Sequence, residues 1–119
     1  MSFHKGLDFN ILNAIFEIKL KMDLNKFGKR AWKCALRRGK VHETTYFCEF
    51  HAETLAGLNE EVDEVNRASE TEESVHLDGY SEIVEELTDV AIVAFTELYR
   101  RGIDIEKVLH EKMKCNERR

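Results

Sequence analysis

The chain has 119 residues, a formal net charge of -5 at pH 7, no proline, and 34% charged residues. Its many glutamate, lysine, leucine and alanine residues favour helices over sheet. The negative charge argues against a general binder of nucleic acid or of anionic membranes, because such proteins need a basic face. We therefore expect a single all-α domain over residues 1–119.

Two further features of the sequence bear on the cellular compartment in which the protein is expected. The apolar stretch near the N-terminus is interrupted by polar residues, so neither a membrane span nor a secretory signal is expected. The three cysteines include no C-x-x-C pair, so neither a disulfide framework nor a zinc knuckle is indicated. These observations favour a cytoplasmic protein.

Residues 1–45 are predicted to form an N-terminal helical region. Apolar side chains at helical spacing after Asp8 predict a first helix over residues 9–22. The pattern over residues 23–40 fits either a continuation bent near Gly28 or a separate short helix. Trp32 in this segment suits the core better than a base-stacking position, but it is kept as a candidate substrate-binding residue. Residues 41–45 are expected to form a loop, with Thr44 or Thr45 capping the next helix.

Residues 46–119 are predicted to carry the metal-binding helices and a C-terminal helix. A helix over residues 46–68 is followed by an acidic loop over residues 69–79 and by a helix that ends near residue 101. Between residues 90 and 99 the only charge is Glu97, so this stretch must be enclosed within the fold or at a subunit interface. Asp104 is expected to cap the last helix. The prediction is a bundle of four to five helices, completed by dimerisation.

Two acidic pairs, Glu61 with Glu64 and Glu86 with Asp89, are the main candidates for function. Helix residues three apart share a face, so each pair directs two carboxylates the same way, along the margin of an apolar surface. A buried carboxylate without a partner is costly. Salt bridges to lysine or arginine are the explanation that spacing alone slightly favours. Four carboxylates brought together would instead suit Mg²⁺ or Mn²⁺.

Other catalytic patterns are weaker. Cys48 with His51 forms one C-x-x-H pair and Glu73 with His76 one E-x-x-H pair, whereas zinc and di-iron sites need further ligands at similar spacing. The chain has neither G-x-x-x-x-G-K nor G-x-S-x-G. A di-iron bundle is therefore a minor alternative.

The order of the motifs resembles a known superfamily. E-x-x-E at Glu61 and Glu64 precedes EELTDV at residues 85–90, GID at 102–104 and EKMKCNERR at 111–119. From residue 58 to the end, this order is similar to that of the MazG-like, all-α nucleoside triphosphate pyrophosphohydrolases. The resemblance implies Mg²⁺-dependent cleavage of a nucleoside triphosphate to its monophosphate and pyrophosphate, with Mn²⁺ as a substitute, by a homodimer or homotetramer.

The resemblance also assigns roles to individual residues. The metal-binding carboxylates of the superfamily match Glu61, Glu64, Glu86 and Asp89. Either of the first two would act in catalysis by orienting the attacking water or accepting its proton. The substrate-contacting K-x-x-x-N segment of dCTP-cleaving relatives matches Lys112 and Asn116 in the tail. Arg118 would add a further phosphate contact.

The substrate is less well defined than the reaction. The chain departs from dCTP-cleaving relatives at Val93, where they often have an aromatic residue, and its tail lacks their usual aromatic and proline. Phosphoribosyl-ATP, the substrate of another branch of the superfamily, is the alternative. A non-catalytic helical dimerisation or regulatory module is the alternative of a different class.

Overall fold

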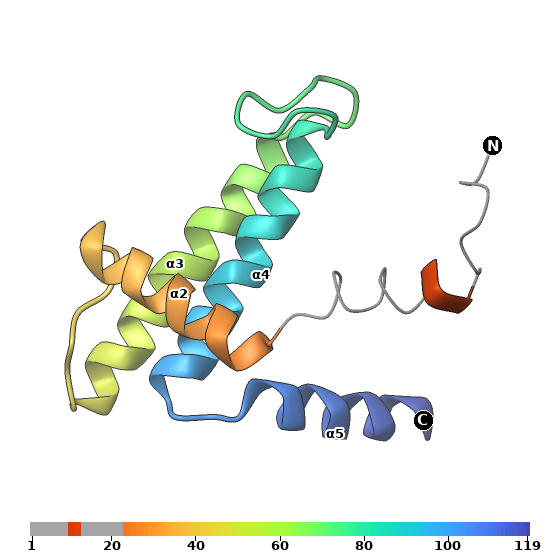
Figure 1. Cartoon of the computed structure of the whole chain (residues 1–119). Helices are drawn as coiled ribbons and strands as arrows, with labels where there is room; N and C mark the ends of the chain where they lie inside the picture. Colours follow the sequence, from red (N-terminus) through yellow and green to blue (C-terminus); the bar gives the residue numbers. More distant parts are fainter. Residues whose placement is uncertain (1–9, 13–22) are drawn as a thin grey trace.

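The computed structural model describes residues 10–12 and 23–119. These residues form α2 (Leu24–Arg37), α3 (Phe47–Arg67), α4 (Glu82–Arg100) and α5 (Ile105–Glu117), and the only strand-like contact among them is an isolated bridge between Glu73 and Ser81 (Figure 1). The prediction of an all-α bundle is confirmed. The helix predicted over residues 9–22 lies outside the described residues, except for residues 10–12, which are helical.

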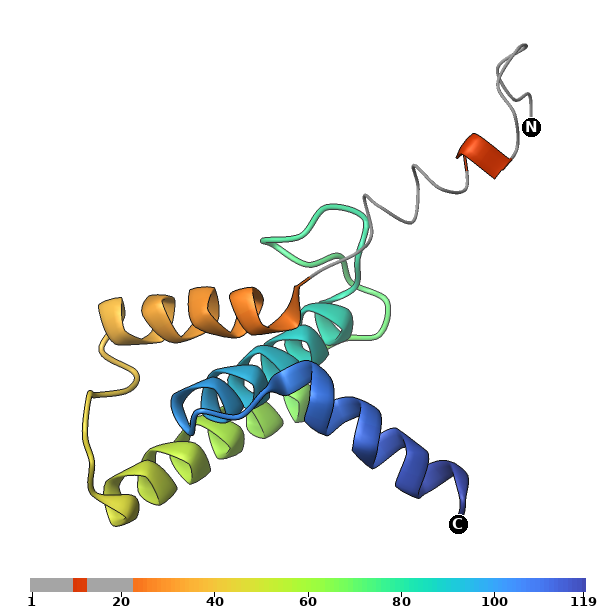
Figure 2. The same ribbon diagram turned by 60° about the horizontal axis from the view of Figure 1, so that its bottom comes forward.

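The central element of the bundle is α4. Both α2 and α3 pack against it, and the backbones of α2 and α3 do not approach each other closely. The α3 and α4 helices run antiparallel and side by side, whereas α5 leads away from the C-terminal end of α4 (Figures 1 and 2). The two ends of α4 therefore have different surroundings, with the α3–α4 loop at one end and α5 at the other.

The start of α2 decides between the two interpretations of residues 23–40. Asp23 has extended backbone angles, and its carboxylate accepts hydrogen bonds from the backbone N–H groups of Asn25 at 3.1 Å and Lys26 at 3.2 Å. This is an N-cap, so α2 is a helix with its own start. Gly28 lies inside α2, and its lack of a side chain permits a close approach to α5: a Cβ there would lie 2.5 Å from the Ile105 side chain.

The capping prediction for the next helix is wrong in position. The N-cap of α3 is Tyr46, whose side chain makes no capping hydrogen bond. Thr44 instead accepts from the backbone N–H of Tyr46 at 3.1 Å, and its hydroxyl donates to the carboxylate of Glu49. Thr44 therefore stabilises the turn that precedes α3 from two residues upstream of the cap.

The predicted start of the last helix is confirmed. Asp104 caps α5 by accepting from the backbone N–H of Lys107 at 3.2 Å, after Gly102 has turned the chain at a φ of +73°. Asn25 of α2 donates to Asp104 at 3.0 Å and accepts from the backbone N–H of Ile105 at 2.8 Å. Since Ile105 is fully buried, this polar junction fixes the start of α5 against α2.

The nearly uncharged segment 90–99 is only partly enclosed by the described residues. Thr96 and Glu97 are buried, whereas Ala91 and Ala94 are exposed. The buried Glu97 carboxylate binds Arg100 at 3.3 Å and Arg101 at 2.8 Å, so its charge is neutralised within the fold. Among the described helices, none combines the length and apolar character that a membrane span requires.

Candidate metal centre

The two acidic pairs come together where α3 ends and α4 begins. Glu61 and Glu64 lie in the last two turns of α3, and Glu86 and Asp89 lie in the first two turns of α4. One carboxylate oxygen from each of the four residues lies within 4.8 Å of the others. The four side chains are partly buried. The structure thus forms the four-carboxylate cup that the helical spacing suggested.

The loop between α3 and α4 sets the register of the two pairs. The backbone N–H of Ser69 donates to the Glu82 carboxylate at 2.9 Å, and the backbone N–H of Ile83 donates to the carbonyl of Ser69 at 3.1 Å. Farther along the loop, the Ser74 hydroxyl donates to the Glu85 carboxylate, which also contacts the His76 ring at 3.1 Å. These contacts hold the last turn of α3 beside the first turn of α4.

The carboxyl groups of the cluster are close enough to raise one another's pKa values. One buried oxygen each of Glu61 and Glu86, the Oε2 atom, has no hydrogen-bond partner. Burial, followed by the hydrogen bond to Glu64 and the charge of Glu64, raises the pKa of both carboxyl groups to about 7. Burial also raises the pKa of Asp89, and the nearby Arg38 and His76 only partly oppose this effect.

The salt-bridge interpretation of the acidic pairs does not hold for the described part of the chain. None of its lysine, arginine or histidine side chains forms an ion pair with Glu61, Glu64, Glu86 or Asp89. A divalent cation fits the site on two grounds: two buried oxygen atoms lack partners, and an all-carboxylate donor set is the type that Mg²⁺ and Mn²⁺ prefer.

Two cavities open beside the cluster. The larger, about 260 Å³, lies between α2, α3 and α4, and Glu61, Glu64 and Asp89 line it together with Arg38 and Lys40 of the α2–α3 region. The smaller, about 190 Å³, is lined by Glu64, Arg67, Ala68, Glu82 and Glu86. Arg38, Lys40 and Arg67 were not among the predicted site residues, although the concentration of positive charge around Arg38 and Lys40 is visible in the sequence.

A comparison with known protein families gives a match that includes the residues of the cluster. A family model described as phosphoribosyl-ATP pyrophosphohydrolase matches residues 35–116, which is more than half of the chain. The chain belongs to the phosphoribosyl-ATP pyrophosphohydrolase family. Neither a search of curated proteins nor a search of solved structures found a significant match.

This family is part of the MazG-like all-α superfamily, so the resemblance is confirmed at the level of the superfamily. At the finer level, the match favours the phosphoribosyl-ATP branch, which the sequence analysis kept as the alternative, over the dCTP-cleaving branch. The matched segment contains the four carboxylates of the cluster and also Arg38 and Arg67.

The remaining predicted site residues of this family member lie apart from the cluster. α5 follows the end of α4 that is opposite the cluster (Figure 2). The predicted substrate-contacting residues of the tail lie on or just after α5, are exposed, and line neither of the two cavities beside the cluster; they are Lys112, Asn116 and Arg118. Within one chain, therefore, the structure brings the four predicted metal ligands together but does not bring the tail to them (Figure 2).

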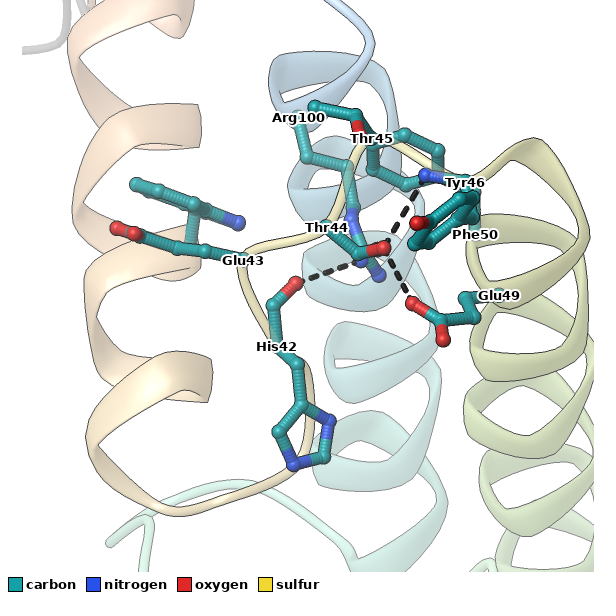
Figure 3. A pocket seen from close by; sticks show the side chains of 9 residues that line it. His42, Glu43, Thr44, Thr45, Tyr46, Glu49, Phe50 and Arg100 are labelled. Atoms are coloured by element: carbon teal, nitrogen blue, oxygen red, sulfur yellow. Dashed lines mark hydrogen bonds between the residues drawn. The ribbon is translucent and has the colours of Figure 1, made fainter.

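Trp32 also lies elsewhere. It lines a different cavity, about 540 Å³, which is formed with the loop over residues 42–46 and with Glu49, Phe50 and Arg100 (Figure 3). Its indole ring packs at 5.7 Å from the ring of Tyr99, and its Nε1 atom is buried without a hydrogen-bond partner. Trp32 is thus a packing residue between α2 and α4 that also faces a cavity away from the carboxylates.

Proposed function

We propose that this protein is a pyrophosphohydrolase that uses a divalent cation, Mg²⁺ or in its place Mn²⁺, to convert phosphoribosyl-ATP to phosphoribosyl-AMP and pyrophosphate. The observation that carries the proposal is the group of four carboxylates within 4.8 Å, none of them paired with a basic side chain of the described residues. Membership of the phosphoribosyl-ATP pyrophosphohydrolase family supports the choice of substrate.

The proposed metal ligands are Glu61, Glu64, Glu86 and Asp89. Bound Mg²⁺ supplies positive charge to the phosphate oxygens and lowers the pKa of a water molecule at the site. Glu61 and Glu64 both line the larger cavity, so either carboxylate is placed to orient the attacking water and accept its proton. The water oxygen forms a bond to phosphorus, the bond to the pyrophosphate group breaks, and no covalent enzyme intermediate is needed.

A homodimer or homotetramer is part of the proposal. None of the 21 residues of α3 is buried, and Leu55 and Val62 of this helix are 46% and 49% exposed. On α4, Leu87 is 53% exposed. A long amphipathic helix without a buried residue needs a further cover, and a second copy of the chain would supply one. Light scattering that finds only monomers at micromolar concentration would contradict the proposed homodimer or homotetramer.

A second copy would also give the C-terminal tail a role. Lys112, Asn116 and Arg118 stay candidates for substrate contact, and they reach a carboxylate cluster only if the tail of one subunit approaches the cluster of another. Removal of residues 112–119 should then weaken substrate binding and leave Mg²⁺ binding unchanged.

The test of the proposed function is a substrate panel. The purified protein is assayed for pyrophosphate release from phosphoribosyl-ATP, ATP and dCTP, with Mg²⁺, with Mn²⁺ and with a chelator. We expect release from phosphoribosyl-ATP that depends on the metal, and an increase in melting temperature when Mg²⁺ binds the folded protein.

Two outcomes of this panel would change the conclusion. Release from dCTP but not from phosphoribosyl-ATP would place the substrate in the branch that the tail first suggested. No release from any nucleotide, together with no effect of Mg²⁺ on the melting temperature, would favour the non-catalytic helical module.

A further inference from the structure

We infer that the substrate lies across the carboxylate cluster, with its nucleoside and α-phosphate in the larger cavity beside Arg38 and its pyrophosphate group in the smaller cavity beside Arg67. This inference rests on the proposed pyrophosphohydrolase function and adds to it an orientation of the substrate and two residues that bind it.

The first observation is the position of the cluster between the two cavities. Glu64 lines both of them, Glu61 and Asp89 line only the larger, and Glu86 lines only the smaller. A phosphoanhydride bond that is cleaved at the cluster therefore has space on both sides. The two products would separate into different cavities.

The larger cavity has the character of a nucleoside site. Its volume of about 260 Å³ is close to the lower end of the roughly 300 to 1,000 Å³ that is usual for small-molecule sites. Its lining includes apolar side chains, among them Ala31, Ala35 and Ile92, together with Thr96 and with Glu53 and Glu97, whose charges are paired with Arg100. A base and a sugar would be enclosed by the apolar side chains, with the α-phosphate at the end that the cluster lines.

Arg38 is available to bind that α-phosphate. It lines the larger cavity, and its charge acts on Asp89 of the cluster. In the described part of the chain its guanidinium forms no ion pair and no side-chain hydrogen bond, whereas the neighbouring Lys40 is paired with Glu60 at 3.1 Å. A guanidinium group without a protein partner is suited to bind phosphate with two parallel hydrogen bonds.

The smaller cavity has a different character. Its volume is about 190 Å³, and apart from Ala68 its lining consists of charged residues, which do not suit a nucleoside base. Arg67 is the basic residue of this lining, and its side chain has no ion pair among the described residues. Three carboxylates of the lining would repel a bare anion, so we expect pyrophosphate to enter only as its complex with Mg²⁺.

The experiment compares the variants Arg38→Gln and Arg67→Gln in the binding of two probes. Isothermal titration calorimetry on the purified full-length protein measures the affinity for pyrophosphate with Mg²⁺ and, separately, for AMP with Mg²⁺. Arg67→Gln should weaken pyrophosphate binding about tenfold or more and leave AMP binding within about twofold. Arg38→Gln should show the reverse pattern.

The matched control is Arg37→Gln. Arg37 is the last residue of α2, directly before Arg38, and is exposed; among the described residues its side chain hydrogen-bonds only to the sulfur of Cys34, at 3.7 Å. This variant should bind both probes as the wild type does. Thermal unfolding of each variant confirms that the comparison is between folded proteins.

Three results would overturn the inference. One is an equal loss of both probes in both variants, another is unchanged binding in both, and the third is a similar loss in the Arg37→Gln control. If the wild type cleaves phosphoribosyl-ATP and one of these results is found, only the orientation fails. If the wild type cleaves no nucleotide and binds neither probe, the proposed function fails and the orientation with it.

Discussion

The guanidinium of Arg100 lies 2.9 Å from the carboxylate of Glu53, and this ion pair joins the end of α4 to the first half of α3. The Arg100 side chain is 1% exposed. It also binds Glu97 at 3.3 Å and the carbonyl of His42 at 3.0 Å, and it stacks on the Phe50 ring with 4.5 Å between the guanidinium carbon and the ring centroid. One buried cation thus holds α3, α4 and the loop before α3 together (Figure 3).

Arg100→Ala should therefore destabilise the fold strongly. Glu53 and Glu97 would be left in a largely buried position without this partner, and breaking a buried ion pair on one side costs about 3 to 5 kcal/mol. Urea unfolding followed by circular dichroism measures the change. The exposed Arg37→Ala is the control, and its effect should stay within about 0.5 kcal/mol. Equal losses in the two variants would contradict the role of Arg100.

Gly28→Ala should also be destabilising, although alanine is favoured over glycine in an isolated helix by up to about 1 kcal/mol. The new Cβ would lie 2.5 Å from the Cδ1 atom of Ile105, which is fully buried, and 3.2 Å from the Cβ atom of Tyr99. Overpacking of this kind costs about 1 to 3 kcal/mol. Gly57→Ala, whose nearest contact is Val93 at 3.3 Å, should be close to neutral in the same urea titration.

Glu64→Gln should remove most of the turnover and of the Mg²⁺-dependent increase in melting temperature. Glu64 contributes to the raised pKa of both Glu61 and Glu86 and lines both cavities, so the amide would replace the central carboxylate of the cluster with a neutral group. Asp89→Asn should act in the same direction. Asp63→Asn is the control, because Asp63 is exposed on the same helix and lies outside the cluster. Wild-type rates in Glu64→Gln would rule out the assignment of this residue.

The metal-free protein should lose stability as the pH rises from about 4.5 to about 7. The pKa values of Glu61 and Glu86 are raised from 4.5 to about 7 in the folded protein, mainly by burial. In this window the folded state binds more protons than the unfolded state, so rising pH favours unfolding. The lowered pKa of Glu53 acts in the opposite sense, with stability lost as the pH falls.

A comparison of variants with the wild type measures how much of this pH dependence comes from the carboxylate cluster. Urea unfolding at several pH values, with chelator present, should show a smaller decline in Glu86→Gln than in the wild type and an unchanged decline in Asp63→Asn. Saturating Mg²⁺ should oppose the decline, because the metal binds the deprotonated carboxylates. A decline in Glu86→Gln as large as in the wild type would exclude the cluster as its source.

Features that depend on a few neighbouring residues were predictable from the sequence. Asp104 as a cap, the end of α4 before Gly102, and the shared face of each acidic pair all follow from interactions within one or two helical turns. The cap of α3 was not predicted correctly: Tyr46 is the N-cap, and the Thr44 hydroxyl bonds instead to the backbone N–H of Tyr46 and to the carboxylate of Glu49. The predicted substrate branch was revised by the family match, since K-x-x-x-N in the tail is a short and weak signal.

The sequence by itself determined the helices, the acidic pairs and the type of ligand that they suit, because periodicity and side-chain chemistry are local properties. Only the tertiary structure decided that Glu61 and Glu64 face Glu86 and Asp89, since this depends on the register set by the α3–α4 loop. The packing of α2 against α4 likewise placed Arg38 beside the cluster and Trp32 away from it. Contacts between distant segments leave no periodic pattern in the sequence.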